Sequence, residues 1–134
     1  MTYDELKKHI STLLKSRRDV SLPALDEDII PLVEQNMLYI ANRYKVLGLV
    51  TNSANFRLLR ALPDGYFIRM PKPPRNGTDH IDMDRELHMA IANFVAADLA
   101  SSEYSRNIFK KNGRRIVKDY AFKLYNTPDP DGVA

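Results

Sequence analysis

Residues 66–100, YFIRMPKPPRNGTDHIDMDRELHMAIANFVAADLA, contain the pattern on which the fold prediction depends. The first five residues are mostly aromatic or aliphatic, which favours a strand. Residues 71–77, PKPPRNG, contain three prolines that cannot donate to a sheet ladder and that favour an extended polyproline conformation. An acidic segment and an alanine-rich run follow, as at the start of a helix that other helices can approach closely. The stretch therefore predicts a rigid extended arm joined to a closely packed helix.

Two helices are predicted before this stretch. Thr2 and Glu5 form a capping-box pattern, which predicts a first helix that ends near residues 17–18, where two arginines suit a helix C-terminus. Acidic residues at 26–28 favour a second helix over residues 26–44, and Pro31 is tolerated there because it lies in the first turn. The apolar face of this second helix repeats at helical spacing through Ile29, Val33, Met37, Ile40, Tyr44 and Leu47.

The residues that lead into the arm predict a β-hairpin over Phe56–Met70. Pro63-Asp64-Gly65 has the chemistry of a tight turn, with proline fixing one dihedral angle and glycine able to supply a positive φ. The flanking segments FRLLRAL at 56–62 and YFIRM at 66–70 have the composition of strands. Arg57, Arg69 and Arg60 are expected to point away from the apolar face of this hairpin.

Two more helices are predicted after the arm. The third begins at Asp82 or Asp84, and the fourth begins near residues 101–102. Gly113 is expected to bend or split the fourth helix, because glycine is unfavourable in a helix interior. Residues 127–132, TPDPDG, have no apolar content and predict an extended tail. The expected core faces are Leu87, Ile91, Phe94, Val95 and Leu99 on the third helix and Tyr104, Ile108, Ile116, Tyr120 and Leu124 on the fourth. The small residues expected to allow close helix contact are Ala90, Ala92, Ala96, Ala97 and Ala100.

Composition limits the class of protein. The chain has 134 residues, of which 44% are hydrophobic and 28% charged, with a net charge of +3 and no cysteine. These values predict one packed domain without a disulfide framework or a cysteine-based zinc site. Charged residues at positions 4–9 interrupt any signal-peptide pattern, and no apolar run approaches a membrane span. We therefore expect no membrane association and an origin in the cytoplasm, or in a particle assembled there.

Together these patterns predict a mainly α protein. Its expected form is a four-helix bundle-like domain over residues 1–126, with a β-hairpin and an extended proline-rich arm inserted at about residues 56–78 and an extended C-terminal tail over residues 127–134. No internal repeat is present.

The acidic segment before the third helix contains the best candidate for a metal site. His80, Asp84 and His88 are spaced by four residues, so a helix running through all three would align their side chains. The Asn76-Gly77 turn and the acidic caps favour instead a helix that begins after His80, with a solvated His88. We therefore expect helix capping here, and neither a metal ion nor a cofactor.

The fourth helix carries most of the excess of positive over negative charge in the protein. Two interpretations stay open: the cations bind phosphate or an acidic partner, or they form the solvated outer side of a helix whose other side is core. The second is favoured, because no base-recognition motif and no aromatic platform accompany the charge. The basic run is Arg106, Lys110, Lys111, Arg114, Arg115, Lys118 and Lys123, and the candidate phosphate-facing residues are Lys110, Lys111, Arg114 and Arg115.

Catalytic patterns are missing from the sequence. There is no cysteine nucleophile, no serine elbow and no glycine-rich phosphate loop, so an enzyme is the weakest class. A subunit interface is the more favoured role for the hairpin arginines, because an isolated hairpin is only marginally stable and needs covering. The candidate interface residues are Arg57, Arg69, Pro71, Lys72, Pro73, Pro74, Pro128, Asp129 and Pro130.

The order of segments resembles the head–tail connector proteins of tailed bacteriophages, also called adaptor or head-completion proteins. The resemblance rests on the N-terminal helix, the amphipathic helix over 26–44, the strand-and-arm segment YFIRMP at 66–71, and IDMD at 81–84 leading into ELHMAIA at 86–92. The strongest local match is Asp84 to Ala92. Arg85, which lies between the acids, and the two histidines of this region depart from the family's pattern.

This resemblance implies a structural subunit of a virion. It would form a dodecameric ring between the portal and the tail, extend the channel through which DNA passes without sequence-specific contact, and bind the portal protein and a tail or nozzle protein. Such a ring needs head-to-tail contacts that close on themselves. The alternatives are a small DNA-binding module that uses the basic helix over residues 103–124 and, less favoured, a metal-dependent enzyme centred on His80, Asp84 and His88.

Overall fold

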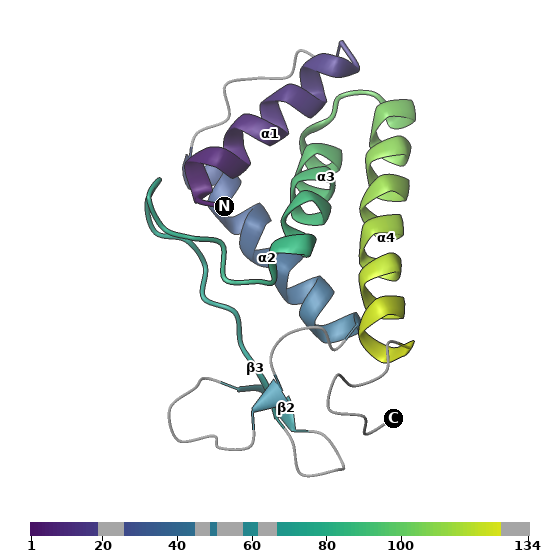
Figure 1. The fold of residues 1–134 in the computed structure, drawn as a ribbon. Coiled ribbons are helices and arrows are strands. Elements are labelled where there is room, and N and C mark those ends of the chain that lie inside the picture. Colours follow the sequence, from purple (N-terminus) through teal and green to yellow (C-terminus); the bar gives the residue numbers. More distant parts are fainter. Residues whose placement is uncertain (19–25, 45–48, 51–57, 62–66, 127–134) are drawn as a thin grey trace.

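A computed structural model describes residues 1–18, 26–44, 49–50, 58–61 and 67–126. The described helices are α1 (Tyr3–Ser16), α2 (Asp26–Tyr44), α3 (His88–Leu99) and α4 (Glu103–Asn126), with a short 3₁₀ helix, η1 (Arg85–Leu87), directly before α3 (Figure 1). The predicted mainly α class is confirmed.

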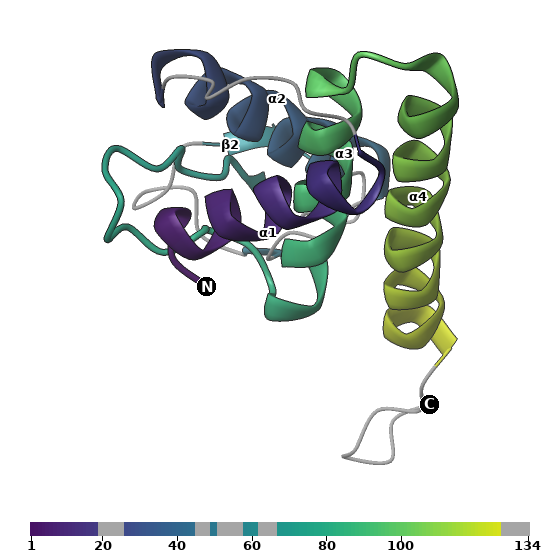
Figure 2. The same cartoon turned by 90° about the horizontal axis from the view of Figure 1, so that it is seen from above.

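α3 is the central helix, and it contacts α1, α2 and α4. Figure 2 shows it lying between α1 and α2 on one side and α4 on the other. Every residue from Ala90 to Ala97 is buried, as expected for a helix that is apolar on all sides. The small residues predicted to allow close contact are all buried, at Ala90, Ala92, Ala96, Ala97 and Ala100.

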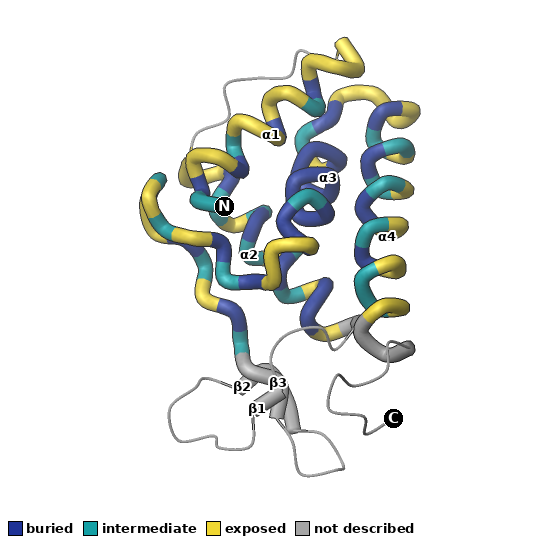
Figure 3. The backbone as a smooth tube through the Cα atoms, viewed as in Figure 1, coloured by how far each residue is buried: buried dark blue, intermediate teal, exposed yellow. Residues whose placement is uncertain are grey.

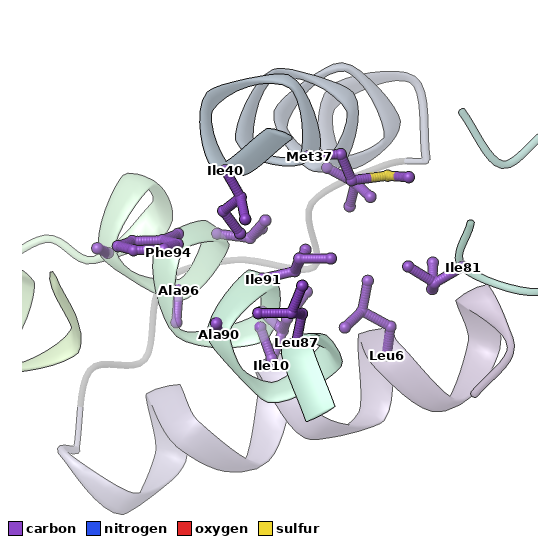
Figure 4. Packing of buried hydrophobic residues seen from close by; sticks show 14 of the residues in the cluster. Leu6, Ile10, Met37, Ile40, Ile81, Leu87, Ala90, Ile91, Phe94 and Ala96 are labelled. Carbon is purple, nitrogen blue, oxygen red and sulfur yellow. The ribbon is translucent and has the colours of Figure 1, made fainter. Parts of the chain in front are cut away.

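The hydrophobic core joins all four helices to the loop before α3. Figure 4 shows Leu6 and Ile10 of α1, and Met37 and Ile40 of α2, converging on Ile91 of α3. Burying an aliphatic side chain of this size contributes about 1.5–3 kcal/mol relative to leaving it exposed. The core therefore depends on contacts between elements that are far apart in the sequence.

The predicted helix termini agree with the structure at α1 and α2. The Glu5 N–H donates to Thr2 Oγ1 (3.3 Å), and the Thr2 N–H donates to Glu5 Oε1 (3.2 Å), which confirms the capping box. Arg17 is the C-cap of α1. α2 has its predicted bounds, and its predicted face is buried at Ile29, Val33, Met37 and Ile40; Leu47 lies outside the described residues.

The prediction for α4 was wrong in two respects. The helix runs continuously through Gly113, so this glycine does not split it. Its buried side is Ser105, Phe109, Gly113 and Val117, spaced by four residues, whereas Tyr104, assigned to the core from the sequence, is 73% exposed. Gly113 is buried because it faces the ring of Phe94 on α3, and a Cβ at this position would lie only 2.8 Å from Phe94 Cε1.

A small antiparallel sheet lies at one end of the molecule (Figure 1). Its order is β1 (Leu49–Val50), β3 (Phe67–Arg69), β2 (Leu58–Ala61), with Val50 and Ala61 both opposite Phe67 and a register shift between Leu58 and Arg60. The edge strand β1 was not predicted. The turn at 63–65 lies outside the described residues, so the hairpin itself stays a prediction.

The proline-rich segment does not form a free arm, which corrects the prediction. Residues 70–80 return to the helical body, as the loop beside the N-terminus in Figure 3 shows, and Pro71 and Pro74 are buried. The main chain of this loop pairs with the start of α1. The Tyr3 N–H donates to the Asp79 carbonyl (2.8 Å), the Asp4 N–H to the Gly77 carbonyl (3.0 Å) and the Ile81 N–H to the Met1 carbonyl (3.0 Å).

The predicted capping of the third helix by Asp82 or Asp84 is also corrected. Asp84 is the N-cap of η1, but its side chain makes no capping hydrogen bond and accepts instead from the Tyr120 hydroxyl of α4. Asp82 Oδ2 accepts from the Lys72 N–H (2.8 Å). The Asp84 carboxylate therefore joins the loop to α4, and the Asp82 carboxylate joins two positions within the loop.

Candidate interaction surface

The side of α4 that points away from α3 is exposed along the length of the helix (Figure 3). Tyr104 and Phe122 are 73% and 68% exposed, and they are 18 residues apart. Since α-helices have 3.6 residues per turn and rise 1.5 Å per residue, these two aromatic side chains share one side of the helix about 27 Å apart. We call the outer face of α4 the set Tyr104, Lys111, Arg114, Arg115, Lys118 and Phe122.

The cations of the outer face form no ion pair within the described part of the chain, and the exposed Asp119 lies one helical turn after Arg115. Lys111, Arg114, Arg115 and Lys118 are all exposed and take part in no ion pair there. The face is therefore a row of positive charge with a large aromatic side chain at each end. Such a surface suits a partner that offers both negative charge and apolar contact area.

The predicted phosphate-facing residues do not all share this position. Lys111, Arg114 and Arg115 lie on the outer face, whereas Lys110 is half-buried. Arg106 Nη2 donates to the Ala100 carbonyl (3.2 Å), so the Arg106 side chain binds the C-terminal end of α3 and is not part of the outer face.

The aromatic part of the outer face was missed from the sequence. Tyr104 was assigned to the core, and Phe122 was not used. The sequence feature that indicates a shared face is the separation of Tyr104 and Phe122 by 18 residues, which equals five helical turns. This separation places both aromatic residues on the side of the helix that carries Lys111, Arg115 and Lys118.

A second charged surface lies at the opposite side of the molecule, where α1 and α2 begin (Figures 1 and 2). We call the acidic edge the exposed residues of these two first turns: Asp4, Glu5, Asp26, Glu27 and Asp28. Lys7 Nζ is bound within this edge, to Asp26 Oδ1 (3.0 Å) and Asp4 Oδ1 (3.3 Å), and Lys8 adds one exposed cation nearby.

Hydrogen bonds favour the ionised form of two carboxylates of the acidic edge. Asp26 Oδ1 accepts from Lys7 Nζ and from the Tyr3 hydroxyl, each at 3.0 Å, and these bonds hold the pKa of Asp26 below its usual value. The hydrogen bonds from Thr2 likewise lower the pKa of Glu5. Glu27 and Asp28 take part in no ion pair with the described residues. The lowered pKa values therefore favour the charged forms of Asp26 and Glu5.

The structure describes only some of the predicted interface residues. Arg57, Pro128, Asp129 and Pro130 lie outside the described residues. Arg69 lies in β3 opposite Leu58. Pro71 and Pro74 are buried within the subunit, while Lys72 is exposed and Pro73 is half-buried.

The candidate metal ligands are also separated. His80 is exposed and pairs through its backbone with Thr2, and the Asp84 carboxylate accepts from Tyr120. His88 is buried, which corrects the expected solvated side chain. Its Nε2–H donates to the Met83 carbonyl (2.8 Å), which leaves Nδ1 to accept from the Met1 amino group (2.9 Å). Over the described ranges, no group of three or more acidic or histidine side chains could hold a metal ion.

No family model, no curated protein and no solved structure matches this chain. None of the helices in the described ranges is both long enough and apolar enough to cross a lipid bilayer.

Proposed function

We propose that this chain is a structural subunit of a tailed-bacteriophage virion, which forms a ring between the portal and the tail, extends the DNA channel and docks tail components. In this proposal the chain is not an enzyme, and it is assembled into the virion in the host cytoplasm. Its partners are other copies of itself in a dodecameric ring, the portal protein, a tail or nozzle protein, and DNA that passes without sequence-specific contact. The finer fold proposed is a four-helix bundle-like domain with an inserted hairpin and a proline-rich segment.

The observation that carries this proposal is the outer face of α4. Tyr104 and Phe122 expose most of their surface at its two ends, and the cations between them lack ion-pair partners in the described part of the chain. Exposed aromatic and arginine side chains are enriched where proteins bind other proteins. A surface of this kind supports the proposal that the chain binds other proteins as a subunit of an assembly. The resemblance to connector proteins implies the same role.

The loop before α3 adds support of a different kind. It connects the sheet to the helical body and is fixed by main-chain hydrogen bonds to α1. A loop held in this way can present Lys72 and Arg75, both exposed, in a defined position without the entropy cost of ordering a free segment on assembly.

The second candidate is a small DNA-binding module that uses helix 103–124. The exposed cations Lys111, Arg114, Arg115 and Lys118 favour it, because unpaired surface cations bind phosphate and release counterions. The solvent-exposed aromatic residues at both ends are compatible with this function, but they are not required for binding a phosphate backbone.

One experiment distinguishes the two candidates. The purified chain is mixed with the portal protein of the same virion, or with a DNA duplex at low salt, and binding is followed by mass measurement and negative-stain imaging. We expect ring-sized particles on the portal, and weaker docking for a chain that lacks residues 127–134. A chain that stays monomeric with the portal contradicts the connector proposal. Submicromolar duplex binding that weakens steeply with salt would favour the DNA-binding module.

A further inference from the structure

We propose that the outer face of α4 binds the acidic edge of a neighbouring copy of this chain. This inference rests on the proposed ring and names the two surfaces that meet in it. Each copy would offer its acidic edge to one neighbour and its outer face to the other.

The positions of the two surfaces are the first evidence for this contact. α4 packs on α3, and α3 separates it from the beginnings of α1 and α2, so the two surfaces lie on opposite sides of the subunit (Figures 1 and 2). A contact between two different patches of identical subunits is head-to-tail, and it generates a ring when the rotation closes. The fold therefore places its two charged surfaces where a ring contact needs them.

The opposite charges of the two surfaces are the second evidence for this contact. The outer face offers Lys111, Arg114, Arg115 and Lys118, and the acidic edge offers Glu27 and Asp28 without ion-pair partners in the described part of the chain. Complementary charge selects which faces meet and increases the rate of encounter, while juxtaposed like charges exclude the wrong pairing. Two outer faces would repel each other, so the same charges disfavour a symmetric dimer through α4.

The aromatic residues favour a protein partner over a nucleic acid. Isolated exposed ion pairs contribute little, so charge alone would give weak contact between subunits. Tyr104 and Phe122 supply large rigid contact areas at both ends of the charged row, as the anchors of protein interfaces do. Nonspecific binding to a phosphate backbone would need the cations only.

A charge-exchange experiment tests the contact. One variant carries Lys111→Glu and Arg115→Glu, and a second carries Glu27→Lys and Asp28→Lys. We expect each variant alone to associate about tenfold or more weakly than the native chain, since like charges would then face each other across the interface. An equal mixture of the two should associate again, because the reversed outer face of one complements the reversed edge of the other. Sedimentation velocity, with and without the portal protein, measures the association.

A matched control keeps the net charge change equal to that of the first variant. Lys15→Glu and Arg17→Glu alter two exposed cations at the far end of α1 and should leave association unchanged. Circular dichroism checks that every variant is folded. A second measurement uses a carbodiimide on mixed light and heavy-isotope copies, which should link Lys111 or Lys118 of one copy to Glu27 or Asp28 of another.

The outcomes separate this inference from the proposed function. Native-like association of the first variant, or the absence of these cross-links in assembled particles, overturns the inference and leaves the ring proposal standing. Loss of duplex binding by the first variant, with association intact, assigns the outer face to nucleic acid and also overturns the inference. A native chain that neither self-associates nor docks on the portal contradicts the proposed function itself.

Discussion

Gly113 shows how a single residue sets the distance between α3 and α4. Its missing side chain leaves room for the Phe94 ring, which also makes an edge-to-face contact with Tyr39 of α2, with ring centroids 5.9 Å apart. Because Phe94 is held from both sides, its ring cannot easily move to admit a side chain at position 113. The low helix propensity of glycine is offset here by packing.

Substitution of Gly113 by alanine tests this account. An alanine in a helix interior contributes about 1 kcal/mol relative to glycine, but overpacking a core typically costs about 1–3 kcal/mol. We expect Gly113→Ala to lower the free energy of unfolding, measured by urea denaturation. The control Asn107→Ala, at an exposed site in the same helix, should raise it slightly.

A second substitution tests whether the contact with Phe94 is the reason that Gly113→Ala lowers the stability. If the clash with Phe94 is the reason for the loss, then Phe94→Leu should make Gly113→Ala less costly, so that the double variant is more stable than the two single effects predict. Additive effects, or a stabilised Gly113→Ala protein, would contradict the role assigned to this contact.

His88 is a buried titratable residue at the start of α3. Its burial, reinforced by the positive charge of the Met1 amino group, lowers its pKa, and the hydrogen bond to the Met83 carbonyl works in the opposite direction. The neutral form is therefore favoured in the folded protein.

This lowered pKa predicts how stability depends on pH. Because the unfolded chain binds the proton more tightly, the contribution of His88 is fully present above its unfolded pKa of about 6.5. It is lost as the pH falls below that value towards the folded pKa. We expect urea denaturation to show a lower stability at pH 5 than at pH 7.5, and His88→Gln to reduce the difference. An equal pH dependence in the native chain and the variant would contradict this assignment.

At the scale of elements, the loop over residues 70–84 has its own anchors. Asp79 Oδ2 accepts from the Arg75 N–H (2.8 Å), and Asp82 Oδ2 accepts from the Lys72 N–H (2.8 Å). Gly77 faces the Asp4 carboxylate so closely that a Cβ would lie 2.2 Å from its Oδ2. The two carboxylate bonds join residues within the loop, and main-chain hydrogen bonds hold this proline-rich segment against the start of α1.

Removal of the two carboxylates should loosen this loop and leave the core intact. We expect Asp79→Ala with Asp82→Ala to cost about 1–3 kcal/mol in total, since each hydrogen bond contributes about 0.5–1.5 kcal/mol. Trypsin should then cleave after Arg75 faster, while Lys72 stays protected by the proline that follows it. Asp119→Ala, an exposed acid on α4, is the control. An unchanged cleavage rate in the double variant would show that these bonds do not hold the loop.

Helices were easier to predict than the segments between them. The capping box at Thr2 and the acidic start of α2 are local patterns, and they placed both helices correctly. By contrast, β1 has two residues and depends on pairing with Phe67 and Ile68, which no local pattern indicates. The anchored loop depends on contacts with α1, which lies about seventy residues earlier in the chain.

At the scale of the whole molecule, the separation of charge follows from how the helices are packed. The first turns of α1 and α2 are acidic, which suits helix N-termini, and the fold places these two ends together. The basic helix packs on the other side of α3, so opposite charges occupy opposite sides of the subunit. The charge-exchange experiment therefore belongs to this scale, because it tests two surfaces that lie on opposite sides of the subunit.

Local patterns in the sequence were enough to predict the mainly α class, the start of α1, the bounds of α2 and the alanine-rich central helix, because capping and apolar periodicity act over a few residues. Which side of α4 is buried depends on how this helix packs against α3, which no local pattern indicates. Because α4 has apolar residues on more than one side, its sequence periodicity does not indicate which side faces the core. In the structure, the Phe94 ring packs against Gly113, and the side of α4 that contains Gly113 is buried. This packing turned Tyr104 outward, beside the cations. The stretch over residues 66–100 likewise predicted its central helix correctly, but not its arm, because hydrogen bonds to α1 determine where the proline-rich segment lies.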